Sequence, residues 1–361
     1  MENDMKEKKL IAVDAGKHGT KVFALTDGIV NQKKMRTKIS AGSFADDMVK
    51  RGTFVCQIDS GGPVYNVGNG ARNEPAAETS KKSEIHRVLT LAAVARMLGE
   101  GTHENVGIAI GLPLDICENV AERLSYKEYI LGKPGEMHAV RLKLTSNSPV
   151  EEVRFTFGRQ LVYPEGIGAL YKYPALCAGQ PVGVIDIGHI NTNCMYYNSF
   201  EPVLDSCFTD EMGGKFLVSE LNGRLSAELG SNVDDNIVAS LLMKPYEDRY
   251  LVMPGGADVA ERSRVVIDET LRNHVLSIRQ RCRTRHWPID FMLKIFIGGT
   301  SRLLEREIKE VFGESVIIAD DAEFVNAHGF LKMLCAQEEI DLDRIEEEAR
   351  NGSEGKDQGT V

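Results

Sequence analysis

The sequence predicts an α/β protein built from two related domains, and two observations support this prediction. Segments rich in strand-forming residues alternate with segments of helical periodicity along the 361 residues of the chain. In addition, an apolar strand ends in an acid twice, at Asp14 and at Asp186. Each aspartate is followed by glycine after two positions and by threonine after six. Such an internal repeat indicates two similar domains, each of which offers one loop to a shared cleft.

The composition is that of an ordinary globular protein, because 42% of the residues are hydrophobic and 27% are charged. No apolar run reaches the roughly 18 residues that a membrane-spanning helix needs. The charged start of the sequence does not resemble a secretory signal. We therefore expect a cytoplasmic protein that does not bind membranes.

The net charge argues against a DNA-binding surface, and the spacing of the cysteines argues against a zinc site. The net charge of −10 argues against direct binding to DNA phosphates. The basic run at 279–286 is expected to be the solvated face of a helix. The seven cysteines are scattered without the spacing of a zinc site, which predicts free thiols.

The first half of the chain is expected to be rich in strands. Residues 9–15 and 21–28 are predicted to form a hairpin around the first acidic loop. Apolar residues at helical spacing predict a helix over 83–98. Further strands are expected at 53–59, 64–68, 105–113, 138–146 and 151–164, and a helix at about 165–173.

The second half repeats the pattern with more helix. A buried strand over 181–188 carries the second acidic loop, and helices are predicted at 214–229 and 257–285. Residues 294–313 are expected to form a strand, a glycine-rich turn and a helix. The acidic and then Gly/Ser-rich residues 341–361 are predicted to be a disordered tail.

The two acidic loops have the composition of phosphate-binding turns. Gly16 and Gly188 allow a tight turn whose N–H groups can point at phosphate oxygens. The hydroxyls of Thr20 and Thr192 can add further donors.

The acids and one lysine suit the rest of such a site. Asp14 and Asp186 cannot bind phosphate, but they can hold Mg²⁺ directly or through its waters. Lys21 can place a positive charge on the phosphates. These residue types at this spacing predict binding of a magnesium nucleotide.

Two more glycine-rich turns strengthen the prediction. "GGTSR" at 298–302 follows a strand and begins a helix, where a side chain would collide with a base or ribose. "EMGGK" at 211–215 lies at a predicted helix start. The P-loop signature and the dinucleotide G-x-G-x-x-G fingerprint are both absent from the sequence.

Taken in order, these motifs resemble those of the actin-fold ATPases, which include actin, the Hsp70 ATPase domain and the sugar kinases. The chain is most similar to bacterial ParM-type plasmid segregation actins. "LIAVDAGKHGTK", "VGVIDIGHINTN" and "IFIGGTSRLL" resemble the two phosphate loops and the adenosine motif. "TDEMGGKFL" and "EFVNAHGFLKML" resemble the nucleotide-proximal helix start and the closing helix.

The resemblance implies a set of site residues. Asp14 takes a magnesium position, Asp186 lies near the metal, and Lys21 takes the position of a phosphate-binding lysine. The residues implied to contact the nucleotide are Gly16, Lys17, His18, Gly19, Thr20, Lys21, Gly188, His189, Asn191, Thr192, Gly213, Gly214, Gly298, Gly299 and Thr300.

Pro164–Glu165 matches a Pro-Glu pair that begins a helix beside the γ-phosphate in the family. The resemblance implies that Glu165 is catalytic, because the family glutamate orients or deprotonates the attacking water. A proline and a glutamate also suit the first turn of any helix, so the alternative is a capping role.

The fold implied is actin-like, with two related α/β domains flanking a nucleotide cleft. Domain I is expected over 1–180, with an insert at about 30–80, and is completed by a C-terminal helix at 320–340. Domain II is expected over 181–319, with an insert at about 215–270.

The function implied is an ATPase that uses ATP, or GTP, with Mg²⁺ and polymerises into filaments. An adaptor of the ParR type, bound to centromere-like plasmid DNA, would connect the filament to its cargo. Three alternatives remain: a small-molecule kinase of the same superfamily, a different bacterial actin-like cytoskeletal filament, and a scaffold that binds nucleotide without hydrolysis.

Overall fold

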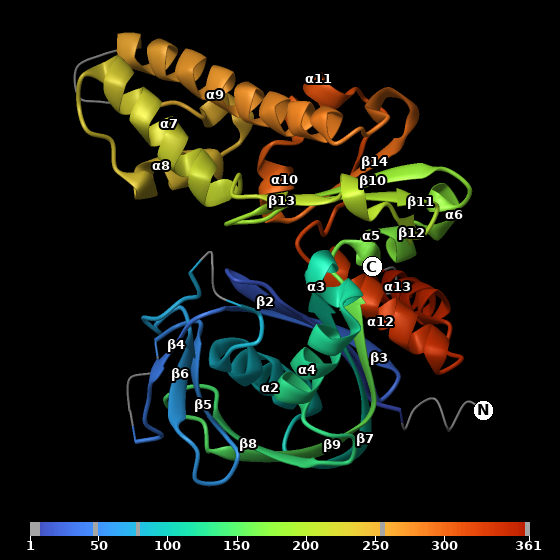
Figure 1. The fold of residues 1–361 in the computed structure, drawn as a ribbon. Helices are drawn as coiled ribbons and strands as arrows, with labels where there is room; N and C mark the ends of the chain where they lie inside the picture. Colours follow the sequence, from blue (N-terminus) through green and yellow to red (C-terminus); the bar gives the residue numbers. More distant parts are fainter. Residues whose placement is uncertain (1–7, 46–49, 77–79, 253–256, 358–361) are drawn as a thin grey trace. The chain divides into compact units, whose positions relative to one another are not determined.

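A computed structural model describes residues 8–45, 50–76, 80–252 and 257–357. The chain divides into two compact units, coloured along the sequence in Figure 1. Unit 1 contains Met1–Lys172 and Asn326–Val361, and unit 2 contains Tyr173–Val325. The first part of unit 1 thus ends at Lys172, where 180 was expected, and unit 2 ends at Val325, where 319 was expected. Unit 2 is an insertion between the two parts of unit 1.

Unit 1 is built on a nine-stranded mixed sheet in the order β3-β2-β1-β7-β9-β8-β5-β6-β4. β1 pairs with β2 in antiparallel fashion and with β7 in parallel, so it is covered on both edges. β1 is also buried at every position, because helices cover both faces of the sheet at its centre. Burial on both faces explains why its sequence is apolar without alternation. The strands are β1 Leu10–Ala15, β2 Gly19–Thr26, β3 Ile29–Arg36, β4 Ile39–Ala41, β5 Thr53–Ile58, β6 Val64–Gly68, β7 Gly101–Leu112, β8 Met137–Lys143 and β9 Glu151–Pro164.

Helices cover both faces of this sheet. Ile108 and Ile110 of β7 belong to the core that the sheet shares with α2, which lies inside the curve of the sheet in Figure 1. Gly107 and Gly111 point the other way, because side chains alternate along a strand, and they face α12. The helices are α2 Glu84–Leu98, α3 Leu114–Glu118, α4 Val120–Leu131, α5 Ile167–Lys172, α12 Val325–Gln337 and α13 Leu342–Asp357.

The absence of a side chain at Gly111 of β7 lets α12 approach the sheet closely, and Gly107 also faces α12. A Cβ at Gly111 would lie 2.8 Å from the ring of Phe330, and one at Gly107 would lie 3.7 Å from Leu334. Phe330 also stacks on Tyr163 of β9, with ring centroids 5.9 Å apart. α12, which comes from the end of the sequence, is therefore part of the core of unit 1.

Unit 2 is built on a smaller sheet in the order β12-β11-β10-β14-β15, with β13 paired to β11. β10 pairs with β11 in antiparallel fashion and with β14 in parallel, which repeats the arrangement around β1 in unit 1. The strands are β10 Pro181–Ile187, β11 Thr192–Asn198, β12 Glu201–Pro202, β13 Phe208–Asp210, β14 Leu293–Ile297 and β15 Ile317–Ile318.

The helices of unit 2 form a layer that extends past one end of its sheet (Figure 1). Leu217, Leu221 and Leu225 recur every four residues along α7, and they share a core with Leu271 and Val275 of α9. The helices are α6 Pro174–Cys177, α7 Gly214–Leu229, α8 Asp235–Leu242, α9 Ala257–Thr284, α10 Gly299–Leu303 and α11 Glu305–Phe312, with short 3₁₀ turns at Leu204–Ser206, Tyr246–Asp248 and Ile289–Phe291.

Most of the predicted elements are confirmed. The hairpin around the first loop is β1–β2, and the helices predicted at 83–98, 214–229 and 257–285 are α2, α7 and α9. The basic run at 279–286 lies at the end of α9. No helix in the described ranges is long and apolar enough to cross a membrane. The start of the chain, residues 1–7, lies outside the described residues.

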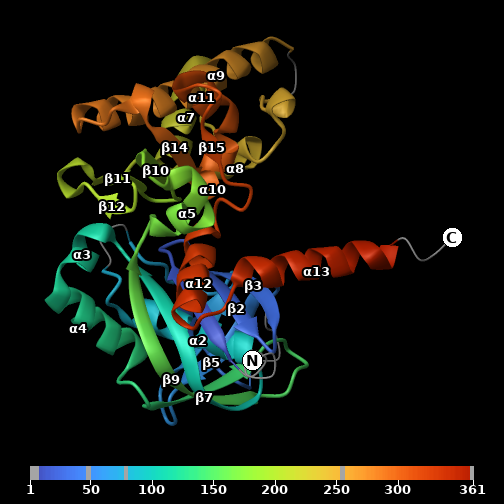
Figure 2. The same ribbon diagram turned by 90° about the vertical axis from the view of Figure 1, so that its right-hand side faces the viewer.

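The predicted disorder of 341–361 is wrong for most of that segment, because Leu342–Asp357 form α13. Leu342 is buried, Asp343 Oδ1 lies 2.7 Å from Lys332 Nζ, and Glu346 Oε1 lies 2.8 Å from His328 Nε2. Figure 2 shows α13 following α12 and then running outward from unit 1. Contacts to α12 thus stabilise a helix that composition alone does not favour. Residues 358–361 lie outside the described residues.

Candidate functional site

The first acidic loop is the tight turn of the β1–β2 hairpin. Asp14 is buried opposite Lys21 in the ladder, and Lys21 Nζ lies 3.6 Å from Asp14 Oδ2. The N–H of Gly16 donates to the carbonyl of Asp14. A Cβ at Gly16 would lie 2.9 Å from the carbonyl oxygen of Gly19, so the turn requires glycine there. The loop therefore holds an acid and a lysine side by side at the end of a buried strand.

Two hydroxyls fix the far side of this loop. Thr37 Oγ1 donates to the carbonyl of Gly16 at 2.5 Å and lies 3.0 Å from Thr20 Oγ1. Since the Thr37 proton is used on Gly16, the Thr20 hydroxyl must donate to Thr37. The proton of Thr20 is thus engaged within unit 1. The ring of His18 hydrogen-bonds with Arg36 of β3.

The second acidic loop joins β10 to β11 and is the corresponding hairpin turn of unit 2, with a different pattern of hydrogen bonds. Gly188 N–H donates to the carbonyl of Asn191 at 2.9 Å, which closes the turn. The Thr192 hydroxyl donates to the carbonyl of Met212 at 2.7 Å. The Asp186 side chain is half-buried at the end of β10. As in the first loop, the threonine hydroxyl holds the fold of the loop.

The other two glycine-rich turns pack against the second loop. Gly214 N–H donates to the carbonyl of Gly188 at 2.9 Å, and Gly213 N–H donates to that of Ile190 at 3.0 Å. The Thr300 hydroxyl donates to the carbonyl of Gly188 at 2.9 Å. Lys215 N–H donates to the carbonyl of His189 at 2.7 Å. The structure therefore brings the three predicted elements of unit 2 together around Gly188.

Gly298 packs closely against the second acidic loop. Its φ of 86° is in the region that favours glycine, and a Cβ there would lie 2.4 Å from Asp186 Oδ1. The turn that follows β14 thus lies directly against the acid at the end of β10. Any larger residue would displace this carboxylate, so the glycine leaves the space that the Asp186 side chain occupies.

Glu165 is buried in unit 1, but it does not begin a helix as predicted. Pro164 is the last residue of β9, and the N–H of Glu165 donates to the carbonyl of Leu112 at 2.8 Å, which prolongs the β7–β9 pairing. Gly166 follows with a φ of 88°, and α5 begins at Ile167. Strand pairing therefore decides the position of Glu165, and the capping interpretation does not apply.

Lys81 joins Glu165 to the first loop, although no sequence motif marks this lysine. Lys81 Nζ lies 2.6 Å from Glu165 Oε1 and donates to the carbonyl of Ala15 at 2.6 Å. Only 6% of Lys81 and 9% of Glu165 is exposed. Burial alone would lower the pKa of Lys81, but the carboxylates of Glu165 and Asp14 outweigh it and raise the pKa. Lys81 is thus a buried cation between two acids of the candidate site.

His86 lies in the first turn of α2 and is buried near the positive charges of Lys81 and Lys17. Burial, followed by the positive charges of Lys81 and Lys17, lowers the pKa of His86 to about 3. The Ser83 hydroxyl lies 2.7 Å from His86 Nδ1. The imidazole is therefore neutral in the folded protein at any pH above about 3.

We expect the neutral His86 to weaken the folded state in mild acid. An unfolded histidine binds a proton below about pH 6.5, whereas folded His86 does not, so stability present above that pH is lost as the pH falls toward 3. The loss is about 1.4 kcal/mol per pH unit, or about 2 kcal/mol at pH 5. Urea unfolding at pH 7.5 and pH 5.0 should show a smaller drop for His86→Gln than for the unmodified chain. His286→Asn, at an exposed turn position, is the control. Equal drops in all three proteins would contradict the assignment.

The acids suit magnesium bound together with phosphates better than a metal held by protein alone. Within the described ranges, no group of three or more His, Cys, Asp or Glu side chains could hold a metal ion. Mg²⁺ usually takes one or two carboxylates and fills its remaining positions with water and phosphate oxygens. Asp14 and Asp186 each end a buried strand beside a glycine turn, which is compatible with that ligand set.

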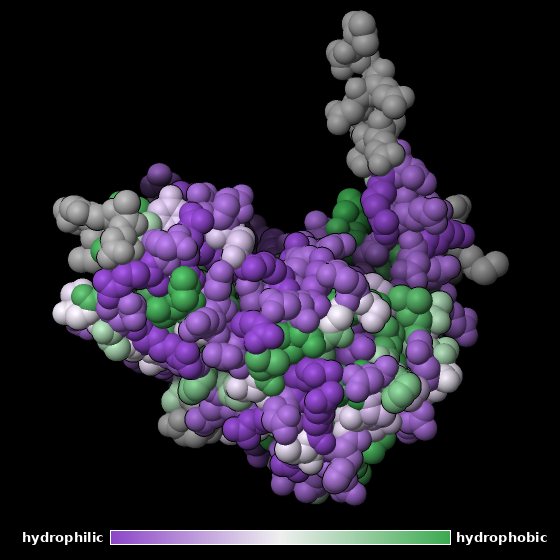
Figure 3. Space-filling view, turned by 90° about the horizontal axis from the view of Figure 1, so that it is seen from above, coloured by the Kyte–Doolittle hydropathy of each residue, from purple (hydrophilic) through white to green (hydrophobic). Residues whose placement is uncertain are grey.

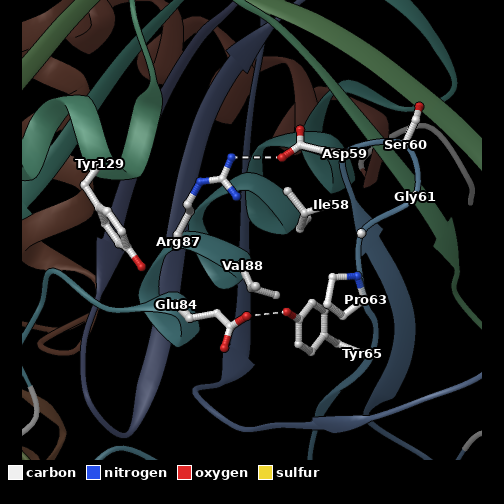
Figure 4. A pocket seen from close by; sticks show the side chains of 11 residues that line it. Ile58, Asp59, Ser60, Gly61, Pro63, Tyr65, Glu84, Arg87, Val88 and Tyr129 are labelled. Atoms are coloured by element: carbon white, nitrogen blue, oxygen red, sulfur yellow. Dashed lines mark hydrogen bonds and ion pairs between the residues drawn. The ribbon is translucent and has the colours of Figure 1, made fainter.

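A separate cavity of about 650 Å³ lies in unit 1 and contains none of the predicted site residues (Figure 4). Arg87 and Asp59 form an ion pair at 2.9 Å on one side, and the Tyr65 hydroxyl donates to Glu84 at 2.6 Å on the other. Ile58 and Val88 lie between the two pairs. The charges of this cavity are therefore largely satisfied by each other.

The chain is similar in sequence to a protein family and to a known relative. Residues 12–168 match the family described as actin like proteins N terminal domain. An archaeal actin homolog from Thermoplasma volcanium is 30% identical over 197 residues, which are 52% of this chain and 58% of that protein. The chain thus spans a little over half the length of this relative.

Similar folds occur in known structures. An archaeal actin homolog in complex with ADP has a TM-score of 0.65 at 20% identity, covering 90% of this chain and 98% of that one. A 15-stranded ParM filament from Clostridium botulinum has a TM-score of 0.66 at 17% identity, covering 91% and 99%. These matches confirm the predicted fold class, an actin-like α/β fold.

Proposed function

Since the chain has the actin-like fold, we propose that it is an ATPase that polymerises into nucleotide-dependent filaments. The observation that carries the proposal is the buried ion pair of Lys81 and Glu165 against the first loop. Burial of a carboxylate beside the proposed phosphate-binding turn lowers the stability of the fold. Buried charged groups of this kind are concentrated at functional sites.

We propose that the two acidic loops and the adjoining glycine turns bind ATP, or GTP, through backbone N–H groups. Lys21 would add a positive charge, while Asp14 and Asp186 would hold Mg²⁺. The bound ion would neutralise charge on the β- and γ-phosphates. The ADP bound to the archaeal actin homolog supports a nucleotide at this kind of site.

Glu165 would orient the attacking water, because Lys81 holds its carboxylate and the hydrogen bond from its N–H to Leu112 of β7 holds its backbone. In this proposal Lys81 is a positioning residue for Glu165. Thr20 and Thr192 would maintain the two loops, since their hydroxyls donate to groups of the protein.

The proposed role of the filament is segregation of plasmid DNA in the cytoplasm. The similarity to a ParM filament supports self-association. The net charge of −10 favours an adaptor of the ParR type as the component that binds centromere-like DNA.

A second candidate function is a cytoskeletal filament without a plasmid cargo. The archaeal actin homolog, at 30% identity, favours this alternative. Loss of a plasmid marker after deletion of the gene would support segregation, while altered cell shape with normal plasmid inheritance would support the cytoskeletal role.

Sedimentation with and without nucleotide tests the proposed function. We expect the chain to pellet in the presence of Mg²⁺ and ATP or a slowly hydrolysed analogue, and to stay in the supernatant without nucleotide. A small-molecule kinase or a non-polymerising scaffold would stay in the supernatant under both conditions, and this result would overturn the proposal.

Asp14→Ala and Asp186→Ala are each expected to lower ATP turnover at least several-fold and to shift its dependence on magnesium to higher concentrations. The reason is the loss of a charged partner of the metal ion. Phosphate release should be measured across a magnesium titration, with Asp115→Ala, an exposed acid of α3, as the control. Normal turnover with normal magnesium dependence in both variants would show that the two loops do not act on the metal.

A further inference from the structure

The cavity in unit 1 lies where three elements meet. It is bordered by the turn between β5 and β6, the start of α2 and the end of α4, and its volume is about 650 Å³. This volume is within the range of pockets that bind small molecules. Its lining contains no residue of the proposed nucleotide site, so a ligand in this cavity is independent of the proposed function.

The turn that borders the cavity is held by the protein itself. The N–H of Asp59 donates to the carbonyl of Ala139 at 2.8 Å, and Gln57 Nε2 donates to the carbonyl of Gly62 at 2.7 Å. Asp59 and Gly61 have positive φ values, of 61° and 86°, which turn the chain sharply. A Cβ at Gly61 would meet no described atom within 4 Å, so this residue borders open space. The cavity is therefore formed before any ligand binds.

The charges on one side of the cavity cancel each other. Arg87 Nη2 lies 2.9 Å from Asp59 Oδ2, so the guanidinium already has a carboxylate as its partner. A ligand anion could reach Arg87 only by displacing Asp59. This side of the cavity therefore offers no advantage to an anion.

Glu84 on the other side carries a negative charge that no cation balances. Its carboxylate accepts from the Tyr65 hydroxyl at 2.6 Å, and within the described residues it forms no ion pair. Burial, followed by the hydrogen bond to Glu84, raises the pKa of Tyr65, so the hydroxyl keeps its proton and remains the donor. With two carboxylates and one guanidinium, the lining has a net charge of −1.

Aromatic and aliphatic side chains form much of the remaining lining. Ile58 and Val88 are buried and lie between the two pairs, and Figure 4 shows Tyr65 and Tyr129 on opposite sides of the hollow. The centroid of the Tyr129 ring lies 5.8 Å from Lys82 Nζ, a distance at which an aromatic ring attracts a cation. Aromatic rings are the groups with which proteins recognise quaternary ammonium ions.

An ion with an apolar body gains most from such a hollow. On the face of the molecule seen in Figure 3, hydrophobic residues form small groups among hydrophilic ones, so this open surface covers little of an apolar ligand. A metal ion gains nothing from apolar side chains, and in the described part of the chain no group of three or more His, Cys, Asp or Glu could hold one. The lining thus favours an organic cation.

We infer that this cavity binds a small organic cation, a quaternary ammonium compound. Its charged group lies against the Glu84 carboxylate and the two tyrosine rings, and its apolar part covers Ile58 and Val88. The pair of Arg87 and Asp59 closes the other side. The inference does not depend on the proposed function, because neither nucleotide nor filament is needed for this binding.

Choline tests the inference against two molecules of nearly the same shape. In its uncharged isostere a tert-butyl group replaces the trimethylammonium group, and the tert-butylacetate anion carries the opposite charge. Binding to the full chain without nucleotide should be measured by isothermal titration calorimetry. We expect choline to bind at least about fivefold more tightly than the isostere, and the anion not to bind. Absence of choline binding, or equal affinities for choline and its isostere, would overturn the inference.

Two substitutions separate the charge from the rings. Glu84→Gln removes the charge but keeps an acceptor for the Tyr65 hydroxyl, and Tyr129→Leu removes one ring. Each is expected to weaken choline binding at least about threefold, and Glu84→Gln should leave the affinity for the uncharged isostere unchanged. Glu122→Gln is the matched control, because Glu122 is also an exposed acid in the first turn of a helix but lies outside the cavity lining. Unchanged choline affinity in the Glu84→Gln protein would contradict the inference, whether or not the chain sediments with ATP.

Discussion

Glu165→Gln is expected to slow phosphate release by about 10²–10⁴-fold while ATP binding and filament assembly persist. The phosphate contacts are assigned to other residues, so loss of the group that orients water should affect the chemical step and spare binding. Filaments of this variant should disassemble late, because their subunits stay in the ATP state. Glutamine keeps the shape of the buried side chain, and the Ala15 carbonyl still accepts from Lys81.

Phosphate release and light scattering should be recorded on one sample of this variant. Glu152→Gln, at a half-buried glutamate on β9 that pairs with Arg154 at 2.7 Å, provides the matched control. Unchanged phosphate release would remove Glu165 from the mechanism. Slow release with disassembly at the normal time would separate hydrolysis from filament turnover.

Lys81→Met is expected to lower the free energy of unfolding by about 3–5 kcal/mol. The substitution removes the cation from a buried pair and leaves the Glu165 carboxylate, 9% exposed, without its partner at 2.6 Å. The double variant Lys81→Met/Glu165→Gln should recover much of the loss, since a neutral amide costs less to bury than a carboxylate.

Urea unfolding of the single and double variants measures this coupling as a double-mutant cycle. Lys82→Met is the matched control, because the neighbouring Lys82 is exposed and its contacts are to Ser125 and Tyr129. We expect a change below about 1 kcal/mol for this surface position. Equal effects of the two lysine substitutions would show that the buried pair does not stabilise unit 1.

The backbone of the candidate site could be predicted because its signals are local. Each acidic loop is a strand, an acid and a glycine within a few residues, and the repeat at Asp14 and Asp186 marks both copies. The hairpins around both loops follow from this short-range pattern. The helices α2, α7 and α9 follow from apolar periodicity in the same way.

The side-chain partners could not be predicted, because they join distant parts of the sequence. In the sequence, Lys81 is one of two adjacent lysines that precede a predicted helix. Only the folded structure brings its side chain to Glu165 and to the carbonyl of Ala15. The start of α5 was misplaced because local rules favour a helix at Pro164–Glu165, whereas pairing with Leu112 extends the strand. Contacts of Leu342 and Glu346 likewise override the composition of α13.

The packing of α12 on Gly107 and Gly111 has a consequence for biosynthesis. When the first 172 residues have left the ribosome, this face of β7 still lacks the helix that covers it, because unit 2 must be translated first. At about 5–20 residues per second, synthesis of Tyr173–Val325 takes roughly 8–30 s. During that interval the nascent chain exposes an apolar sheet face that chaperones can bind. Unit 1 can therefore be completed only after α12 has been translated, which delays its final packing until unit 2 has been made.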